Sequence, residues 1–189
     1  MEYFEQYRST LFQADAWTQL AELKDLVRAT ARASRKVIVA GNGGSAAIAS
    51  HVAVDFTKTA GVRCINFNEA DLITCFANDY GYEHWLEKAL AFYADEGDLV
   101  LLISSSGRSR NMVNAARHAA ANKLTVVTFT GFSKDNPLRA LGRLNCWVDS
   151  HLYNIVEMTH QIWLLAVCDL LVSEAESVER QEPAYAGKP

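Results

Sequence analysis

The chain has 189 residues, half of them hydrophobic, with a formal net charge of −4 and a pI near 5.7. This length fits one domain, and the apolar content is sufficient for a core without disulfides or a structural metal. The acidic balance excludes a global basic field that would attract nucleic acid or an anionic membrane, so a small anionic ligand must be held by local dipoles and a few side chains.

The cysteines and the hydrophobic segments indicate the compartment. No C-x-x-C pair occurs, which predicts reduced, buried thiols. The polar N-terminus lacks the apolar stretch of a signal peptide. Glu157, His160 and Asp169 interrupt the most apolar segment, about residues 154–172, so we expect no membrane span and a cytoplasmic protein. The cysteines are Cys64, Cys75, Cys146 and Cys168.

Predicted strands alternate with predicted helices along the chain. Residues 1–34 predict one or two helices, because apolar residues recur at helical spacing. Further helices are predicted at 45–58, 81–93, 109–121, 136–141 and 154–172, with a short element at 72–76. Strands are predicted at 37–41, 62–67, 99–104, 124–131 and 144–148. This alternation predicts an α/β fold with a doubly wound, flavodoxin-like parallel sheet of five strands covered on both faces.

The two ends of the chain are predicted to differ in their roles. The helix at 154–172 is apolar almost all round, and such a helix is buried on every side. A second copy of the chain is its natural cover, so we expect a homotetramer, or at least a dimer. Residues 1–172 are then one domain with an N-terminal helical extension, and the acidic, proline-containing segment 173–189 is predicted to be a flexible tail.

A first glycine-rich loop, Gly41–Ala46, lies between a predicted strand and a predicted helix. Its glycines allow close backbone approach, and the helix N-terminus offers unpaired N–H groups to an anion. A purely structural tight turn is the plainer alternative. The loop also fits a dinucleotide fingerprint loosely. The second strand, however, ends Asn66-Phe67-Asn68, without the acid that would bind a ribose, which disfavours a nicotinamide enzyme.

A second loop, Ser104–Ser109, again follows a strand and precedes a helix. Three consecutive hydroxyls and a fourth one turn later can surround one phosphate with neutral donors. The plainer alternative is a Ser/Gly turn that caps a helix. A cap needs a single serine, whereas this loop has four. The two loops together therefore predict a site for a phosphorylated small molecule.

The two loops belong to a longer pattern of five motifs. They are GNGGSA (41–46), His51 with Asp55, NDYGYE (78–83), ISSSGRSRN (103–111) and TFTG (128–131). Their order and spacing over about residues 5–172 resemble the phosphoheptose isomerases of the sugar isomerase (SIS) superfamily.

The resemblance implies a substrate and the residues that hold it. The substrate is sedoheptulose 7-phosphate and the product an aldoheptose phosphate. The first loop is implied to touch the sugar, a later Asn-Asp pair to contact substrate, and the serine loop to grip the phosphate. In this chain these residues are Asn42, Gly43, Gly44, Ser45, Asn78, Asp79, Ser104, Ser105, Ser106 and Ser109.

The catalytic and metal positions depart from the family's pattern. Asp55 replaces a glutamate, and Val156 and Leu164 replace a glutamine and a histidine of the family's zinc site. Two helices nevertheless carry paired side chains at helical spacing. We therefore expect a relocated acid–base cluster of Asp55, His51, Glu157 and His160, with zinc as a candidate cofactor on His51, Asp55 and His160. The alternative places His160 in a polar patch of a subunit interface.

Two functions follow from the resemblance. The first is isomerisation of a ketose phosphate to an aldose phosphate through an enediol, which needs a base above the carbon and an acid or metal at the carbonyl oxygen. The second is a non-catalytic SIS protein that binds a phosphosugar or a protein partner, such as those that associate with the bacterial replication initiator. The complete serine loop favours the enzyme, and the loss of the family's glutamine and histidine favours the binding protein.

Overall fold

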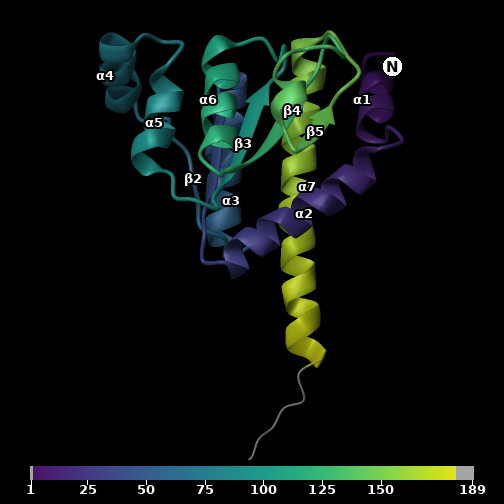
Figure 1. Cartoon of the computed structure of the whole chain (residues 1–189). Coiled ribbons are helices and arrows are strands. Elements are labelled where there is room, and N and C mark those ends of the chain that lie inside the picture. Colours follow the sequence, from purple (N-terminus) through teal and green to yellow (C-terminus); the bar gives the residue numbers. More distant parts are fainter. Residues whose placement is uncertain (1, 182–189) are drawn as a thin grey trace, which may run out of the picture.

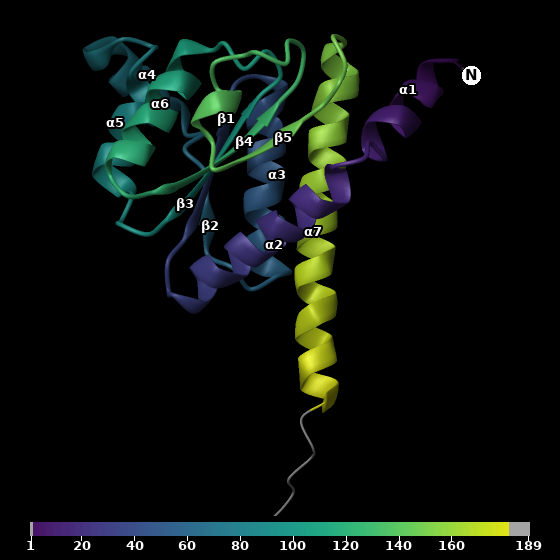
Figure 2. The ribbon, with the colours of Figure 1, turned by 45° about the vertical axis from the view of Figure 1, so that its right-hand side comes forward.

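In a computed structural model, which describes residues 2–181, the chain forms a three-layered α/β domain (Figures 1 and 2). The five strands are β1 (Val37–Gly41), β2 (Cys64–Ile65), β3 (Leu99–Ser104), β4 (Thr125–Thr130) and β5 (Leu144–Trp147). All pair in parallel in the order β2-β1-β3-β4-β5. The predicted doubly wound parallel sheet is confirmed.

Each face of the sheet buries its own hydrophobic cluster. The central strands β1 and β3 are buried along their whole length, and alternate residues face opposite sides. Val39 and Leu101 pack toward α2 (Ala16–Arg32), α3 (Gly44–Lys58) and α7 (Tyr153–Gln181). Ile38 and Leu102 pack toward α5 (Trp85–Tyr93) and α6 (Arg110–Ala121).

Several elements differ from their predicted bounds. The segment 1–34 forms two helices, α1 (Glu2–Leu11) and α2, and a 3₁₀ turn spans Arg139–Leu141. The predicted element at 72–76 is the middle of a longer helix, α4 (Ala70–Tyr80), and the helix after it begins at Trp85 instead of Gly81. Strand β2 is shorter than predicted, because the side chain of Asn66 accepts a hydrogen bond from the Asn68 amide and turns the chain.

Helix α7 continues to Gln181, well beyond the predicted end at 172, and residues 182–189 of the predicted flexible tail lie outside the described residues. By length and composition alone, Tyr153–Ala175 could cross a membrane, with a mean hydropathy of 1.5. Half of its most apolar window is buried, and the helix packs against α1, α2 and α3, as a core helix does. Among the cysteines, three are buried as expected, whereas Cys75 is exposed.

Candidate functional site

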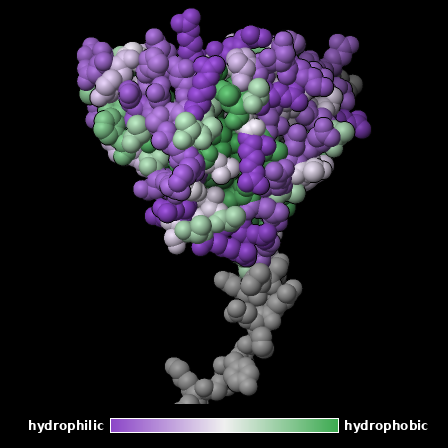
Figure 3. Space-filling model, in the orientation of Figure 1, coloured by the Kyte–Doolittle hydropathy of each residue, from purple (hydrophilic) through white to green (hydrophobic). Residues whose placement is uncertain are grey.

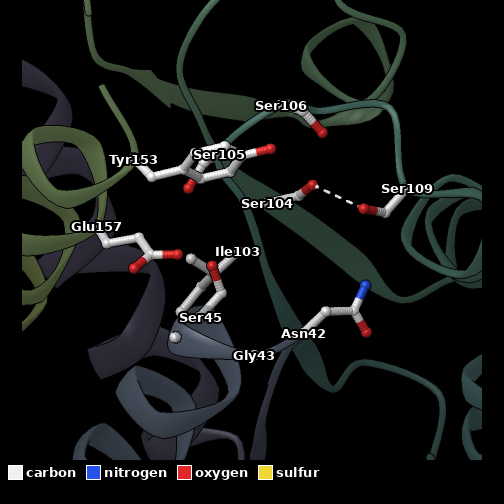
Figure 4. A pocket seen from close by; sticks show the side chains of 11 residues that line it. Asn42, Gly43, Ser45, Ile103, Ser104, Ser105, Ser106, Ser109, Tyr153 and Glu157 are labelled. Carbon is white, nitrogen blue, oxygen red and sulfur yellow. Dashed lines mark hydrogen bonds between the residues drawn. The ribbon is translucent and has the colours of Figure 1, made fainter. Parts of the chain in front are cut away.

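A cavity of about 310 Å³ opens at the carboxyl ends of β1 and β3 (Figure 4). The chain leaves these neighbouring strands toward opposite faces of the sheet, into α3 on one side and α6 on the other. Such a switch point is where doubly wound sheets place their ligands. The lining residues are Asn42, Gly43, Gly44, Ser45, Ile103, Ser104, Ser105, Ser106, Ser109, Tyr153 and Glu157.

The first glycine loop forms one wall of the cavity. A Cβ on Gly41 would lie 2.6 Å from Ser45, so only glycine allows the chain to turn this tightly from β1 into α3. Gly43 has φ +55°, and its carbonyl accepts the first amide hydrogen bonds of α3, from Ala46 and Ala47. The N-terminus of α3, with its partial positive charge, therefore faces the cavity.

The serine loop forms the opposite wall. The Gly107 amide donates to the Ser104 carbonyl at 2.9 Å, and Gly107 has φ +61°. The Arg108 amide donates to the Ser106 hydroxyl at 3.3 Å, and the hydroxyls of Ser104 and Ser109 are 3.5 Å apart. The loop leads directly into α6, so hydroxyls and helix amides face the same space. The buried hydroxyl of Ser105 has no hydrogen-bond partner among the described residues.

The side chain of Asn42 is held in a hydrogen-bond network at the edge of the cavity. Its amide forms reciprocal hydrogen bonds with the amide of Asn111, at 3.0 and 2.9 Å. The Tyr82 hydroxyl donates to Asn42 Oδ1 at 3.1 Å. Asn111 and Tyr82 were missed at the sequence level as individual site residues, although both lie within the motifs quoted for the resemblance.

Helix α7 supplies an acid and a phenol to the third wall. Glu157 and Tyr153 lie one helical turn apart, and Figure 4 shows both side chains projecting from this helix toward the loops. Burial raises the pKa of Glu157 above its ordinary value. Tyr153 was missed by sequence reasoning, although its spacing from Glu157 was a usable signal.

The expected cluster of Asp55, His51, Glu157 and His160 does not form within this chain. His51 Nε2 lies 3.3 Å from Asp55 Oδ2, and Gln161 donates to His51 Nδ1 at 3.0 Å. This group lies further along α3 than the cavity lining, as the spacing of about 1.5 Å per residue requires. Glu157 lines the cavity without His51 or Asp55.

His160 is a core residue, which also contradicts the alternative that placed it in a polar patch of a subunit interface. Its ring is completely buried beside Phe129 and Trp163, and its Nε2 donates to the Thr130 carbonyl at 3.1 Å. Burial lowers the pKa of His160 from 6.5 to about 4, against the opposing effect of the bond to Thr130. A buried neutral imidazole of this kind belongs to the packing of the fold.

Asn78 and Asp79 also lie outside the cavity lining. Both are exposed at the C-terminal end of α4, where the Asn78 amide donates to Asp79 Oδ1 at 2.9 Å. Within one chain they do not join Asn42 or the serine loop at the cavity.

The candidate zinc ligands His51, Asp55 and His160 do not fit a metal site. His160 is bonded to a backbone carbonyl in the core, away from the His51–Asp55 pair. Over the described part of the chain, no group of three or more His, Cys, Asp or Glu side chains is placed to hold a metal ion. Val156 and Leu164, at the family's ligand positions, are buried hydrophobic residues.

Comparison with known proteins places this architecture in a family. A model of the SIS domain matches residues 2–131, more than half of the chain. The chain belongs to the SIS-domain family. This SIS domain is 34% identical over 142 residues to a phosphoheptose isomerase of Burkholderia pseudomallei, with 72% of each chain covered.

A second sequence relative and a solved structure are also similar to this chain. A phosphoheptose isomerase of a Bradyrhizobium species is 36% identical over 106 residues, a match that covers 53% of this SIS domain and about half, 54%, of the relative. The solved structure of a phosphoheptose isomerase from Francisella tularensis superposes with a TM-score of 0.84 at 24% identity, covering 91% of this chain and 95% of the other. The structural likeness confirms the fold.

Proposed function

We propose that this SIS domain is a phosphosugar isomerase that interconverts a ketose phosphate and an aldose phosphate, with sedoheptulose 7-phosphate and a heptose 7-phosphate as the substrate pair. One observation carries the proposal. A serine loop suited to phosphate and a half-buried carboxylate of raised pKa, that of Glu157, line the same cavity. The phosphoheptose isomerases among the relatives favour the seven-carbon sugar.

The serine loop binds the phosphate in this proposal. The hydroxyls of Ser104, Ser106 and Ser109 donate to phosphate oxygens, together with the amides that open α6. Neutral donors and a helix dipole suit a chain of net negative charge, because no basic cluster is needed. The sugar then extends toward Asn42 and the N-terminus of α3.

Glu157 carries the proton between the two carbons. Its carboxylate removes a proton from C1 of the ketose while the C2 carbonyl oxygen takes up a proton from water, which gives the enediol. The carboxylic acid then returns its proton to C2, the O1 hydroxyl gives its proton back to water, and the aldose is formed. A carboxyl group whose pKa is raised by burial suits both halves of this exchange, since it must accept and donate near neutral pH.

The His51–Asp55 pair remains a second candidate for proton transfer. It lies on the accessible side of α3, where it is reached only by a sugar that extends along the helix or by one bound to a neighbouring subunit.

A non-catalytic regulator that binds a phosphosugar or a protein partner, including the replication-initiator type, is the second candidate function. The observation that favours it is the burial of Val156 and Leu164, which leaves the family's glutamine and histidine positions without polar groups. Such a protein would keep the serine loop and bind sugar phosphates without converting them.

We also propose that the chain assembles into a homotetramer, or at least a dimer, in the cytoplasm. Exposed hydrophobic residues occur on α7 and α3, and hydrophobic residues reach the surface in the middle of the face in Figure 3. Figures 1 and 2 show the distal part of α7 projecting beyond the sheet. The exposed Met158, Ile162 and Leu170 of the same helix form the surface that a second copy would cover. Light scattering at micromolar concentration should give a multiple of 20.9 kDa, and a monomer mass would contradict assembly.

Incubation of the purified protein with sedoheptulose 7-phosphate tests the two functions together. The isomerase converts it to an aldose phosphate of equal mass and different retention time. The regulator binds it, as measured by calorimetry, and leaves it unchanged.

A further inference from the structure

Asn42 and Asn111 form a closed amide pair that links the two ligand loops. Asn42 belongs to the loop after β1, and Asn111 lies in the first turn of α6, directly after the serine loop and 69 positions further along the chain. Two hydrogen bonds of opposite direction, 3.0 and 2.9 Å long, join the side chains. One side-chain pair therefore ties the first glycine loop to the start of α6, above two strands that are already paired in the sheet.

Asn111 has the burial expected of a positioning residue. It is 2% exposed, and both of its amide groups are used on Asn42. Buried amides lose water on folding, and replacing both partners of such a pair with apolar groups is often nearly neutral for stability. The pair therefore contributes mainly orientation, because two parallel hydrogen bonds fix the plane of the Asn42 amide.

Tyr82 adds a third point of attachment. Its hydroxyl bonds Asn42 Oδ1 at 3.1 Å from the turn between α4 and α5. That turn is itself anchored on α6, where the Asn114 amide donates to the Glu83 carbonyl at 3.0 Å. Asn42 is thus restrained by α6 directly through Asn111, and indirectly through Tyr82.

The remaining hydrogen-bonding capacity of Asn42 is small. A side-chain amide offers two N–H donors and one oxygen with two acceptor positions. Asn111 takes one donor and one acceptor position, and Tyr82 takes the other acceptor position. A single N–H is left for the ligand, so Asn42 can only donate, to an oxygen of the sugar.

We propose that Asn111 and Tyr82 are positioning residues that hold Asn42 so that its one free N–H meets a sugar oxygen. This inference rests on the proposed isomerase function and concerns the same cavity. Neither residue needs to touch the substrate, and both act through Asn42. A misplaced Asn42 weakens the alignment of the sugar with Glu157 while the phosphate remains held by the serine loop.

A double-mutant cycle tests this proposal. Asn42→Ala and Asn111→Ala are each expected to lower kcat/KM for sedoheptulose 7-phosphate by about tenfold or more. The double variant should be no slower than the slower single variant, because the residues act as one unit. Tyr82→Phe removes only a hydroxyl and should have a smaller effect, which disappears in the Asn42→Ala background. Asn122→Ala, at the other end of α6, is the matched control.

Two further readouts separate positioning from folding. Affinity for inorganic phosphate should be the same in wild type and Asn111→Ala, because the serine loop is unchanged. Multiplicative losses in the cycle, unchanged turnover in Asn111→Ala, or parallel loss of phosphate affinity and melting temperature would each overturn the proposal. If wild type binds sedoheptulose 7-phosphate without turnover, the isomerase proposal fails. The same double-mutant cycle is then measured on the Kd for sedoheptulose 7-phosphate. The double variant should again bind no more weakly than the weaker single variant, and multiplicative losses of affinity would overturn the positioning role.

Discussion

The carboxylate of Glu157 lies directly against Gly44, the first residue of α3. A Cβ at position 44 would stand 2.7 Å from the carboxyl carbon of Glu157, closer than such atoms approach. The absence of a side chain at Gly44 therefore allows an acid from α7 to reach the helix N-terminus that faces the cavity. In the proposed mechanism this contact sets the position of the base.

Gly44→Ala should displace the Glu157 carboxylate while preserving the fold. The obstructed group is the flexible end of a side chain, so we expect the free energy of unfolding to change by no more than about 1 kcal/mol. Turnover should fall about tenfold or more, because a displaced base loses alignment with the sugar carbon. Chemical denaturation and a steady-state assay give the two values.

The matched control for this variant is Ala47→Gly, on the exposed side of the same helix. It should cost about 1 kcal/mol of stability with turnover retained. Equal turnover in Gly44→Ala and wild type would show that the Glu157–Gly44 contact has no catalytic consequence.

Glu157→Gln keeps the shape of the side chain and removes its proton chemistry. Turnover should fall by about a hundredfold or more with affinity for the sugar phosphate largely kept, as for a general acid–base group. In wild type, kcat/KM should decline as pH falls through the pKa of Glu157, because the base must be ionised. That decline should occur above the usual carboxyl range, since burial raises this pKa.

Asp55→Asn provides the comparison for the other candidate carboxylate. A hundredfold loss in Asp55→Asn, with Glu157→Gln at the wild-type rate, would assign proton transfer to the His51–Asp55 pair and contradict the assignment to Glu157.

Ser106→Ala should weaken binding of a sugar phosphate by about 1–3 kcal/mol, because a phosphate oxygen loses a hydroxyl donor in a partly desolvated cavity. Titration calorimetry measures this directly. Ser9→Ala, which removes an exposed hydroxyl on α1, should bind as wild type does. Unchanged affinity in Ser106→Ala would reject the serine loop as the phosphate site.

His160 should make the fold sensitive to acid. Its pKa is about 4 in the folded chain and 6.5 when unfolded, so the unfolded state binds the extra proton between these values. Stability is therefore fully present above pH 6.5 and is lost as pH falls toward 4, by about 3 kcal/mol. His160→Gln can still donate to the Thr130 carbonyl. Between pH 6.5 and 4 its free energy of unfolding, measured with denaturant, should fall by about 3 kcal/mol less than that of wild type. Parallel stability curves for the two proteins would contradict this account.

The sequence alone predicted the parts of the site that are built from one contiguous segment. The serine loop and the glycine loop are each contiguous, and each combines a strand end, a turn and a helix start. Their residues line one cavity, because strand and helix geometry places both loops at the carboxyl ends of β1 and β3. The alternation of strands and helices likewise predicted a parallel sheet covered on both faces.

Prediction failed where the rotation of a helix decides the environment. His160 and Gln161 follow Glu157 by three and four residues. Because each residue turns the helix by about 100°, their side chains leave α7 to opposite sides of the Glu157 side chain. Glu157 reaches the cavity, His160 the core and Gln161 the His51 ring. The pairing of Asn42 with Asn111 could not be predicted either, since it depends on how two loops far apart in sequence approach each other.

The most direct test of the account is turnover of sedoheptulose 7-phosphate by the wild-type protein beside Glu157→Gln. The account predicts that wild type forms an aldose phosphate of the same mass, and that Glu157→Gln binds the ketose phosphate but converts it about a hundredfold more slowly. If wild type binds sedoheptulose 7-phosphate and related ketose phosphates and converts none of them, the isomerase proposal is contradicted and the chain is a phosphosugar-binding SIS protein.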